Sequence, residues 1–170
     1  HNLAQGDSWV AAARSPLLAP GVCMGEGDHI VGIDGRMFDG QHDIEKALEA
    51  RVGQKTNLLI KRKGKSQIEQ VEVTPLANAH LTRYRDWVNA NKEYVHKKSG
   101  GKLGYVHIPD MGLHGFSEFY RNFLNEVKKE GLVVDVRYNG GGHVSQHILK
   151  ILAQNTIGFD KTRYMDIEPY

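Results

Sequence analysis

One stretch of the sequence constrains the fold more than any other. Leu132–Val136 is a short and nearly continuous apolar run, and the three consecutive glycines Gly140–Gly142 follow it closely. A run of this kind is typical of a strand that is buried on both faces, as in a parallel sheet. Because His143–Asn155 then shows a helical pattern, the stretch predicts a strand, a glycine turn and a helix. The inward face of that helix is expected to carry Val144, Ile148, Ile151 and Leu152.

The preceding segment repeats this alternation. Lys102–Ile108 is predicted to be a strand, and Ser117 is predicted to cap a helix that runs to about Lys129. A βαβα order of this kind indicates parallel strands joined by a crossover helix. Two such strands leave open edges and little core, so we expect an unfinished sheet in a piece of a longer protein. The first residue, His1, is not a Met, which is consistent with this expectation. After Asn155 the helical pattern ends, and a loop is expected.

The region before Leu76 has a different pattern, because it is rich in turn signals and short alternating segments. It predicts a small β module with a helix over Asp43–Arg51, which Asp43 caps and Gly53 ends. Ile68–Val73 alternates imperfectly, which favours an edge position in the sheet. The predicted strands are His29–Ile33, Asn57–Lys61 and Ile68–Val73, and tight turns are expected at Asp34-Gly35 and Lys63-Gly64-Lys65.

A long helix is predicted between these two regions, over Ala77–Ser99, and Gly100-Gly101 is expected to end it. The spacing of its apolar residues indicates one apolar stripe that packs against the rest of the protein and a second apolar stripe formed by Trp87 and Tyr94. The first stripe comprises Leu81, Tyr84, Val88, Asn91 and Val95. The overall class is therefore α+β. The expected boundaries are a β module over 1–76, a linking helix over 77–101 and an incomplete α/β segment over 102–170.

Charge and composition exclude several classes of protein. The chain has 22 basic and 20 acidic residues, a net charge of +2, which excludes a strongly basic nucleic-acid binder. The basic cluster at Lys61–Lys65 is predicted to be a solvated hairpin tip rather than a nucleic-acid patch. Cys23 is the single cysteine, so no intrachain disulfide is possible. No apolar run is long enough for a membrane helix, and no signal peptide is evident. We therefore expect no nucleic-acid or membrane partner.

The glycine turn is the strongest candidate site. Bare backbone amides before a helix favour negative charge, so a phosphate or the oxyanion of an acyl transfer are both suitable ligands. A phosphate is less favoured, because neither Gly-Lys-Ser/Thr nor Gly-x-Gly-x-x-Gly is present. The alternative without a ligand is a turn that lets the strand and the helix pack tightly. Asp135 and Arg137 lie two residues apart on one strand face, and we expect them to pair and hold the turn.

Three other groups of residues are weaker candidates for a metal site or a catalytic nucleophile. His143 and His147 have a spacing that can bind zinc, but no third ligand is evident and no metal site is predicted. Ser145 lacks the Gly-x-Ser-x-Gly context of a nucleophile elbow. Cys23 has no activating neighbour in the sequence. No cofactor is predicted.

These motifs together resemble one known family. The chain is similar to the tricorn-type proteases, which are members of the tail-specific, or C-terminal processing, serine peptidases. Two segments, Gly104–Met111 and Gly131–Gly142, resemble the catalytic core, and Arg83–Val88 with Tyr94–His96 resembles the helix that links it to a PDZ domain. Ser15–Leu17, Ala19–Val22, Gly25–Asp28 and Ile33–Arg36 resemble the middle of a circularly permuted PDZ domain.

The resemblance implies roles for individual residues. It assigns an oxyanion-hole amide to Gly142, with Gly141 as the alternative, and gives Asp135, Arg137 and Asn139 the role of supporting the loop. The nucleophilic serine and its acidic partner are expected downstream of this chain, and the base histidine upstream. The isolated chain is therefore expected to be inactive. The PDZ-like module is expected to be clipped at its N-terminus, since its carboxylate-binding loop lies at or before His1.

The parent is expected to be a serine endopeptidase that hydrolyses peptide bonds through an acyl-enzyme. Its partners would be peptides or unfolded polypeptides, and it would form a homo-oligomer. The expected location is cytoplasmic, or periplasmic if an upstream signal peptide exists. The alternative function is a non-catalytic PDZ-type module for peptide binding or scaffolding.

Overall fold

The computed structural model describes residues 3–7, 9–39, 44–154, 158–161, 163–164 and 166–169. The chain forms two compact units, His1–Ala90 and Asn91–Tyr170. The division falls within helix α2 (His80–Lys98), the element predicted over Ala77–Ser99. Gly100 and Gly101 follow it with positive φ angles, as expected for residues that end a helix.

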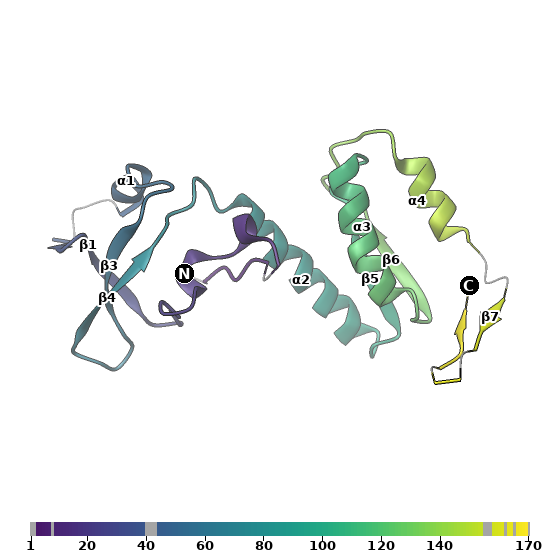
Figure 1. Cartoon of the computed structure of the whole chain (residues 1–170), viewed down its shortest axis with the longest axis horizontal. Helices are drawn as coiled ribbons and strands as arrows, with labels where there is room; N and C mark the ends of the chain where they lie inside the picture. Colours follow the sequence, from purple (N-terminus) through teal and green to yellow (C-terminus); the bar gives the residue numbers. More distant parts are fainter. Residues whose placement is uncertain are drawn as a thin grey trace. The chain divides into compact units, whose positions relative to one another are not determined.

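The first unit is built on an antiparallel sheet with the strand order β2-β1-β3-β4. Figure 1 labels three of its strands, β1, β3 and β4. Its elements are β1 (His29–Ile33), β2 (Arg36–Met37), α1 (Ile44–Glu49), β3 (Thr56–Lys61) and β4 (Ile68–Val73), preceded by two 3-10 turns at Ala11–Ala13 and Pro16–Leu18. Asp34 and Gly35 have φ angles of 47° and 81°, which make the tight turn between β1 and β2. The predicted strands and the edge position of Ile68–Val73 are confirmed.

The core of this unit lies against the sheet, where side chains of α1 and of the segment before β1 pack on the strands. Its buried members are Val22, Met24, Ile33, Leu58, Ile60, Val71 and Val73. Helix α1 is shorter than predicted, because it ends at Glu49 and the chain turns before Gly53. The Gly53 N–H donates to the Pro75 carbonyl at 3.0 Å, which ties this turn to the end of β4. The expected cap, Asp43, lies outside the described residues.

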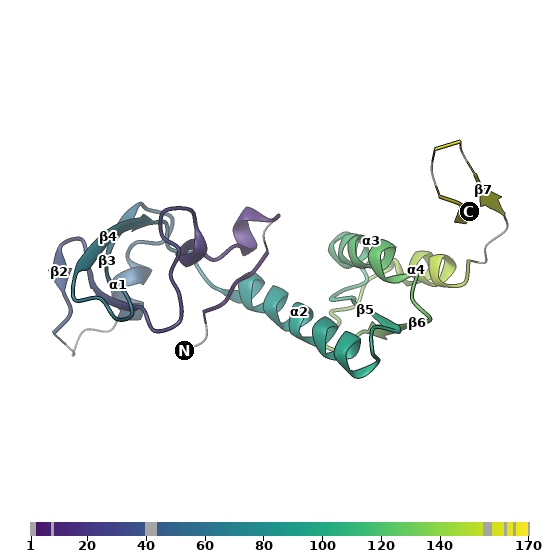
Figure 2. The ribbon, with the colours of Figure 1, turned by 90° about the horizontal axis from the view of Figure 1, so that it is seen from below.

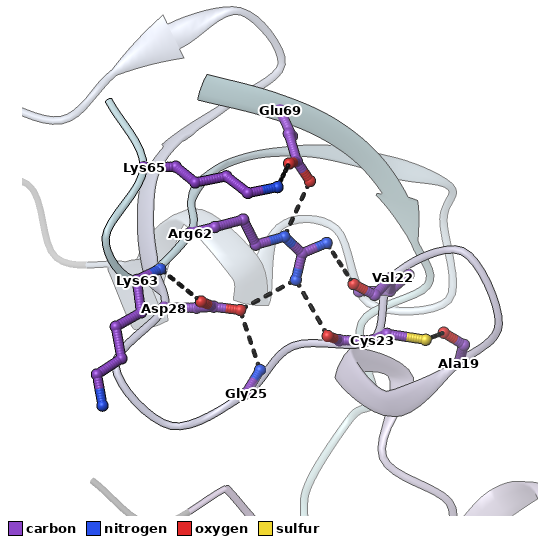
Figure 3. A network of polar contacts seen from close by, with 9 residues as sticks. All are labelled: Ala19, Val22, Cys23, Gly25, Asp28, Arg62, Lys63, Lys65 and Glu69. Carbon is purple, nitrogen blue, oxygen red and sulfur yellow. Dashed lines mark hydrogen bonds and ion pairs between the residues drawn. The ribbon is translucent and has the colours of Figure 1, made fainter. Parts of the chain in front are cut away.

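Arg62 corrects the prediction of a solvated hairpin tip (Figure 3). Its guanidinium donates to Asp28 at 3.0 Å, to Glu69 at 2.9 Å and to the Val22 carbonyl at 2.6 Å. Hydrogen bonds from the Gly25 and Lys63 N–H groups and from Arg62 lower the pKa of Asp28 to about 2. The sequence pattern grouped Arg62 with its lysine neighbours, whereas in the structure it joins β3 and β4 to the loop before β1.

The first half of α2 holds the N-terminal segment through the polar side chains of Asp86 and Arg85 rather than through the apolar stripe that was predicted. Asp86 accepts the N–H groups of Gln5 and Gly6 at 2.9 and 2.8 Å. Arg85 pairs with the buried Asp7 at 3.0 Å. The predicted stripe is correct at Val88 and wrong at Leu81, which is 42% exposed, and in the second stripe Tyr94 is 62% exposed.

The second unit contains the predicted βαβα order. Its elements are β5 (Leu103–His107), α3 (Leu113–Glu126), β6 (Gly131–Asp135), α4 (Ser145–Leu152), β7 (Phe159–Asp160) and β8 (Glu168–Pro169). Strands β5 and β6 pair in parallel, with Tyr105 opposite Val133. Both α3 and α4 pack on this pair, and the buried core comprises Val106, Ile108, Phe119 and Ile148 (Figure 2).

This unit differs from the prediction in several places. Helix α3 begins at Leu113 rather than Ser117, because Asp110 accepts the N–H groups of Gly112 and Gly115 at its first turn. Helix α4 begins at Ser145 rather than His143. Where a loop was predicted after Asn155, β7 and β8 form a short antiparallel pair.

Glu126 fixes the last turns of α2 within this unit. Its buried carboxylate lies 2.7 Å from both Lys92 Nζ and His96 Nε2, and it accepts the Tyr105 N–H at 3.2 Å. Burial disfavours the charged form, but these partners outweigh it and lower the pKa of Glu126. In the part of the chain that the structure describes, no helix is long and apolar enough to cross a membrane.

Candidate functional site

The glycine loop, Asn139–Val144, is hydrogen-bonded along its length to a template segment, Ile108–Met111. Gly140 donates to the Pro109 carbonyl at 2.9 Å, and the Asn139 side chain donates to the Ile108 carbonyl at 2.9 Å. The Met111 N–H donates to the Gly141 carbonyl at 2.7 Å. The Met111 carbonyl accepts the N–H groups of His143 and Val144 at 2.7 and 2.9 Å. The loop is therefore held by backbone contacts to a segment far from it in the sequence.

These contacts set the direction of the Gly142 N–H. The Gly141 carbonyl and the Gly142 N–H belong to one peptide group, and in a trans peptide they point in opposite directions. Because the Gly141 carbonyl faces Met111, the Gly142 N–H points away from the template segment. Within the described part of the chain this N–H has no acceptor, and Gly142 is exposed.

Gly141 differs from Gly142 in this respect. Its N–H donates to the Asn139 side-chain oxygen at 2.7 Å. The Asn139 amide thus uses both of its ends, one on Gly141 and one on Ile108. Sequence reasoning left the two glycines as alternatives, whereas the hydrogen bonds leave the Gly142 amide available to an added acceptor.

Glycine is required at position 142 for two reasons. Its φ angle is 137°, a conformation that residues with a side chain rarely adopt. A Cβ there would overlap the Met111 carbonyl and lie 2.9 Å from the Gly112 nitrogen. Gly141 also has a positive φ, 81°, but a Cβ there would meet open space.

The expectation that the glycine amides lie at a helix N-terminus is wrong. Helix α4 begins three residues after Gly142, and Val144 is its N-cap residue. The intervening amides of His143 and Val144 are bonded to Met111. Of the amides from Gly140 to Val144, only the Gly142 N–H is therefore left without an acceptor in the described structure.

The predicted pairing of Asp135 and Arg137 is confirmed at the end of β6. Arg137 Nη2 lies 2.6 Å from the Asp135 carboxylate, and Nε lies 3.0 Å from both of its oxygens. The Tyr105 hydroxyl donates to the same carboxylate at 2.7 Å. The Arg137 hydrogen bonds hold the pKa of Asp135 well below its usual range, while burial and this carboxylate raise the pKa of Tyr105. The buried ring of His107 contacts the Arg137 carbonyl at 2.8 Å.

In the described part of the chain, the side chains of the remaining candidates make no hydrogen bond with Gly141 or Gly142. His143 belongs to the glycine loop, where its backbone N–H donates to Met111, and the His147 N–H donates to the Val144 carbonyl at 3.0 Å. Ser145 and His147 are exposed on α4, and Cys23 is an exposed free cysteine in the other unit. Among the described residues, no group of three or more His, Cys, Asp or Glu side chains is placed to hold a metal ion. Sequence reasoning missed the template role of Met111 and the contacts of Asp110. The available signal was an aspartate followed by glycines two and five positions later.

Comparison with known protein families gives one match in each of the two units. Residues 1–78 match the family described as tricorn protease PDZ domain, and residues 102–164 match peptidase family S41. Tricorn protease homolog 1 of Streptomyces coelicolor is 42% identical over 90% of this chain and 14% of its own length. Tricorn protease of Thermoplasma acidophilum is 39% identical over 97% of this chain and 15% of its own length.

A solved structure agrees with these matches. The crystal structure of the tricorn protease superimposes with a TM-score of 0.88 and 37% identity, over 98% of this chain and 16% of that chain. The chain thus spans about one seventh of the length of these curated relatives. Over nearly its whole length this chain is therefore similar to the tricorn proteases, with a PDZ-like module over 1–78 and a segment similar to peptidase family S41 over 102–164.

Proposed function

We propose that the parent of this chain is a serine peptidase that cleaves peptide bonds through an acyl-enzyme, and that the Gly142 N–H donates to its oxyanion. The observation that carries the proposal is the exposed Gly142 amide, which the template segment directs outward and which has no acceptor in the described structure. The match of residues 102–164 to peptidase family S41 supports the class of reaction.

The chemistry follows from this geometry. When a nucleophile attacks a peptide carbonyl, negative charge develops on the carbonyl oxygen, and an N–H placed about 2.7–3.1 Å from it stabilises the transition state. A donor that is already oriented needs no rearrangement during the reaction. The serine nucleophile, its acidic partner and the base histidine are expected in other segments of the parent, so we expect the 170 residues alone to be inactive.

The supporting residues act on the shape of the loop. Asn139 spans the gap between the template segment and Gly141. Asp135 and Arg137 hold the chain between β6 and the loop, and the Asp135 carbonyl also accepts the Ile108 N–H at 2.9 Å. We propose that these three residues keep the glycine loop rigid and do not contact the substrate.

A fluorophosphonate probe for activated serines tests the proposal, together with a peptidase assay. Both are applied to this chain and to a longer protein that includes the flanking segments of the same gene. We expect only the longer protein to be labelled and to cleave peptides. Labelling of the short chain would place a nucleophile within it, with Ser145 as the first residue to examine.

The second candidate function is peptide binding without catalysis. The match of residues 1–78 to a PDZ family favours it, as does an apolar cavity of about 420 Å³ beside α1, lined in part by Leu17, Ile30, Leu48, Leu58 and Val73. Absence of labelling in both proteins would make this function the better explanation. A homo-oligomeric parent, peptide or unfolded polypeptide substrates and a cytoplasmic location stay predictions.

A further inference from the structure

Asp110 lies at the junction of the template segment and α3, and its carboxylate is fully used. One oxygen accepts the N–H groups of Gly112 and Gly115 at 2.7 and 3.0 Å. The other lies 3.0 Å from His114 Nδ1. The bond to Gly112 closes a turn over Met111, the residue between them, and thereby restricts the backbone angles of Met111.

Met111 connects Asp110 to the glycine loop, because the backbone of Met111 is hydrogen-bonded to that loop. Its N–H holds the Gly141 carbonyl, and its carbonyl holds the N–H groups of His143 and Val144. Because the Gly141 carbonyl and the Gly142 N–H share one peptide group, a rotation of the Met111 backbone would also turn the Gly142 N–H. Gly142 also packs directly on the peptide that Asp110 binds, since a Cβ there would lie 2.9 Å from the Gly112 nitrogen.

We propose that Asp110 is a positioning residue for the oxyanion donor, because its carboxylate holds Met111 and Gly112 in the conformation that directs the Gly142 N–H outward. This inference rests on the proposed function and adds a residue from outside the glycine loop. Partial burial disfavours the Asp110 carboxylate, but hydrogen bonds from Gly115, Gly112 and His114 outweigh it and lower its pKa. Asp110 is therefore an acceptor at neutral pH.

A purely structural role at the first turn of α3 makes different predictions. Loss of a helix cap lowers the amount of folded enzyme but leaves the turnover number of the folded molecules unchanged. A positioning role lowers kcat in the folded enzyme with little change in KM, because only the developing oxyanion uses the amide. It also predicts rescue by asparagine, whose side-chain oxygen can accept the same two backbone N–H groups.

The experiment compares Asp110→Ala and Asp110→Asn in the longer protein. The control is Asn78→Ala, which removes the side-chain acceptor of the His80 N–H at the start of α2. We expect Asp110→Ala to lower kcat by about 10- to 100-fold, as for a displaced reacting group. We expect Asp110→Asn to stay within about threefold of wild type, and the control to match wild type. Should Asp110→Ala unfold, Asp110→Glu replaces it, since the added methylene moves the acceptor, and the same loss is expected.

Hydrogen–deuterium exchange of the peptide that contains the glycine loop gives a readout that needs no activity. Asp110→Ala should accelerate exchange at Gly140, His143 and Val144, and Asp110→Asn should not. The inference is overturned if loop exchange is unchanged in Asp110→Ala, or if Asp110→Asn loses as much kcat as Asp110→Ala. If the wild-type longer protein neither cleaves nor labels, the proposed function fails, and the exchange data alone decide whether Asp110 holds the loop.

Discussion

The substitution Gly142→Ala tests the oxyanion donor most directly. Alanine cannot adopt the φ angle of 137° without strain, and its Cβ would overlap the Met111 carbonyl. The loop must therefore move away from the template segment, and this movement changes the orientation of the Gly142 N–H. Loss of one oxyanion-hole donor lowers kcat by about 10²- to 10³-fold, or about 2.7–4 kcal/mol, and this is the loss that we expect.

Gly141→Ala is the matched control for that substitution. It places the same methyl group one residue earlier, at a φ angle of 81°, with open space around the added Cβ. The backbone strain is about 1–2 kcal/mol, and the N–H at this position is already bonded to Asn139. We therefore expect a loss of thermal stability in both variants and a large loss of kcat in Gly142→Ala alone.

The assay measures kcat and KM with a chromogenic peptide on the longer protein, with the rate of fluorophosphonate labelling as a second reading and thermal denaturation as the measure of folding. We expect KM to change little, because the amide is used chiefly in the transition state. The reasoning is refuted if Gly141→Ala loses as much kcat as Gly142→Ala, or if Gly142→Ala retains kcat within about threefold of wild type.

Two further predictions concern stability. Tyr105→Phe removes the hydrogen bond from the hydroxyl to the Asp135 carboxylate and should lower the free energy of unfolding by about 1.5–3 kcal/mol, measured by urea denaturation; an unchanged midpoint would contradict this. Asp28 has a folded-state pKa of about 2 against an ordinary value of 3.8, so its contribution is present above about pH 4 and is lost as the pH falls towards 2. The stability difference between wild type and Asp28→Asn should therefore shrink over that range, and a constant difference would exclude this linkage.

Local sequence pattern predicted most of the secondary structure. The alternation in Ile68–Val73 and the apolar run at Leu132–Val136 are each properties of a few neighbouring residues, and both segments form strands close to the predicted bounds. The ends of the helices were predicted less accurately than the strands. Helix α3 begins one turn before Ser117, because the capping carboxylate of Asp110 lies three residues before the helix and was not considered.

Side-chain burial along the long helix was harder to predict than the helix itself. Periodicity assigned Leu81 to the packed stripe, yet the buried side chains beside it are Thr82 and Arg85. Arg85 is buried because Asp7, from a distant part of the sequence, supplies a charged partner. Such partners are set by the fold, so hydrophobic spacing does not indicate them.

In the candidate site too, some features depend on neighbouring residues and others on contacts between distant parts of the chain. The sequence by itself determined the βαβα order, the pairing of Asp135 with Arg137 and the position of the glycine turn between β6 and α4, because each depends on residues close together in the chain. Only the tertiary structure decided that Gly142, and not Gly141, leaves its N–H available. That choice depends on Met111 and Ile108, the latter 31 residues from the Asn139 side chain that it binds. The direction of an amide is set by what its peptide group contacts across the fold, and spacing along the chain carries no record of that contact.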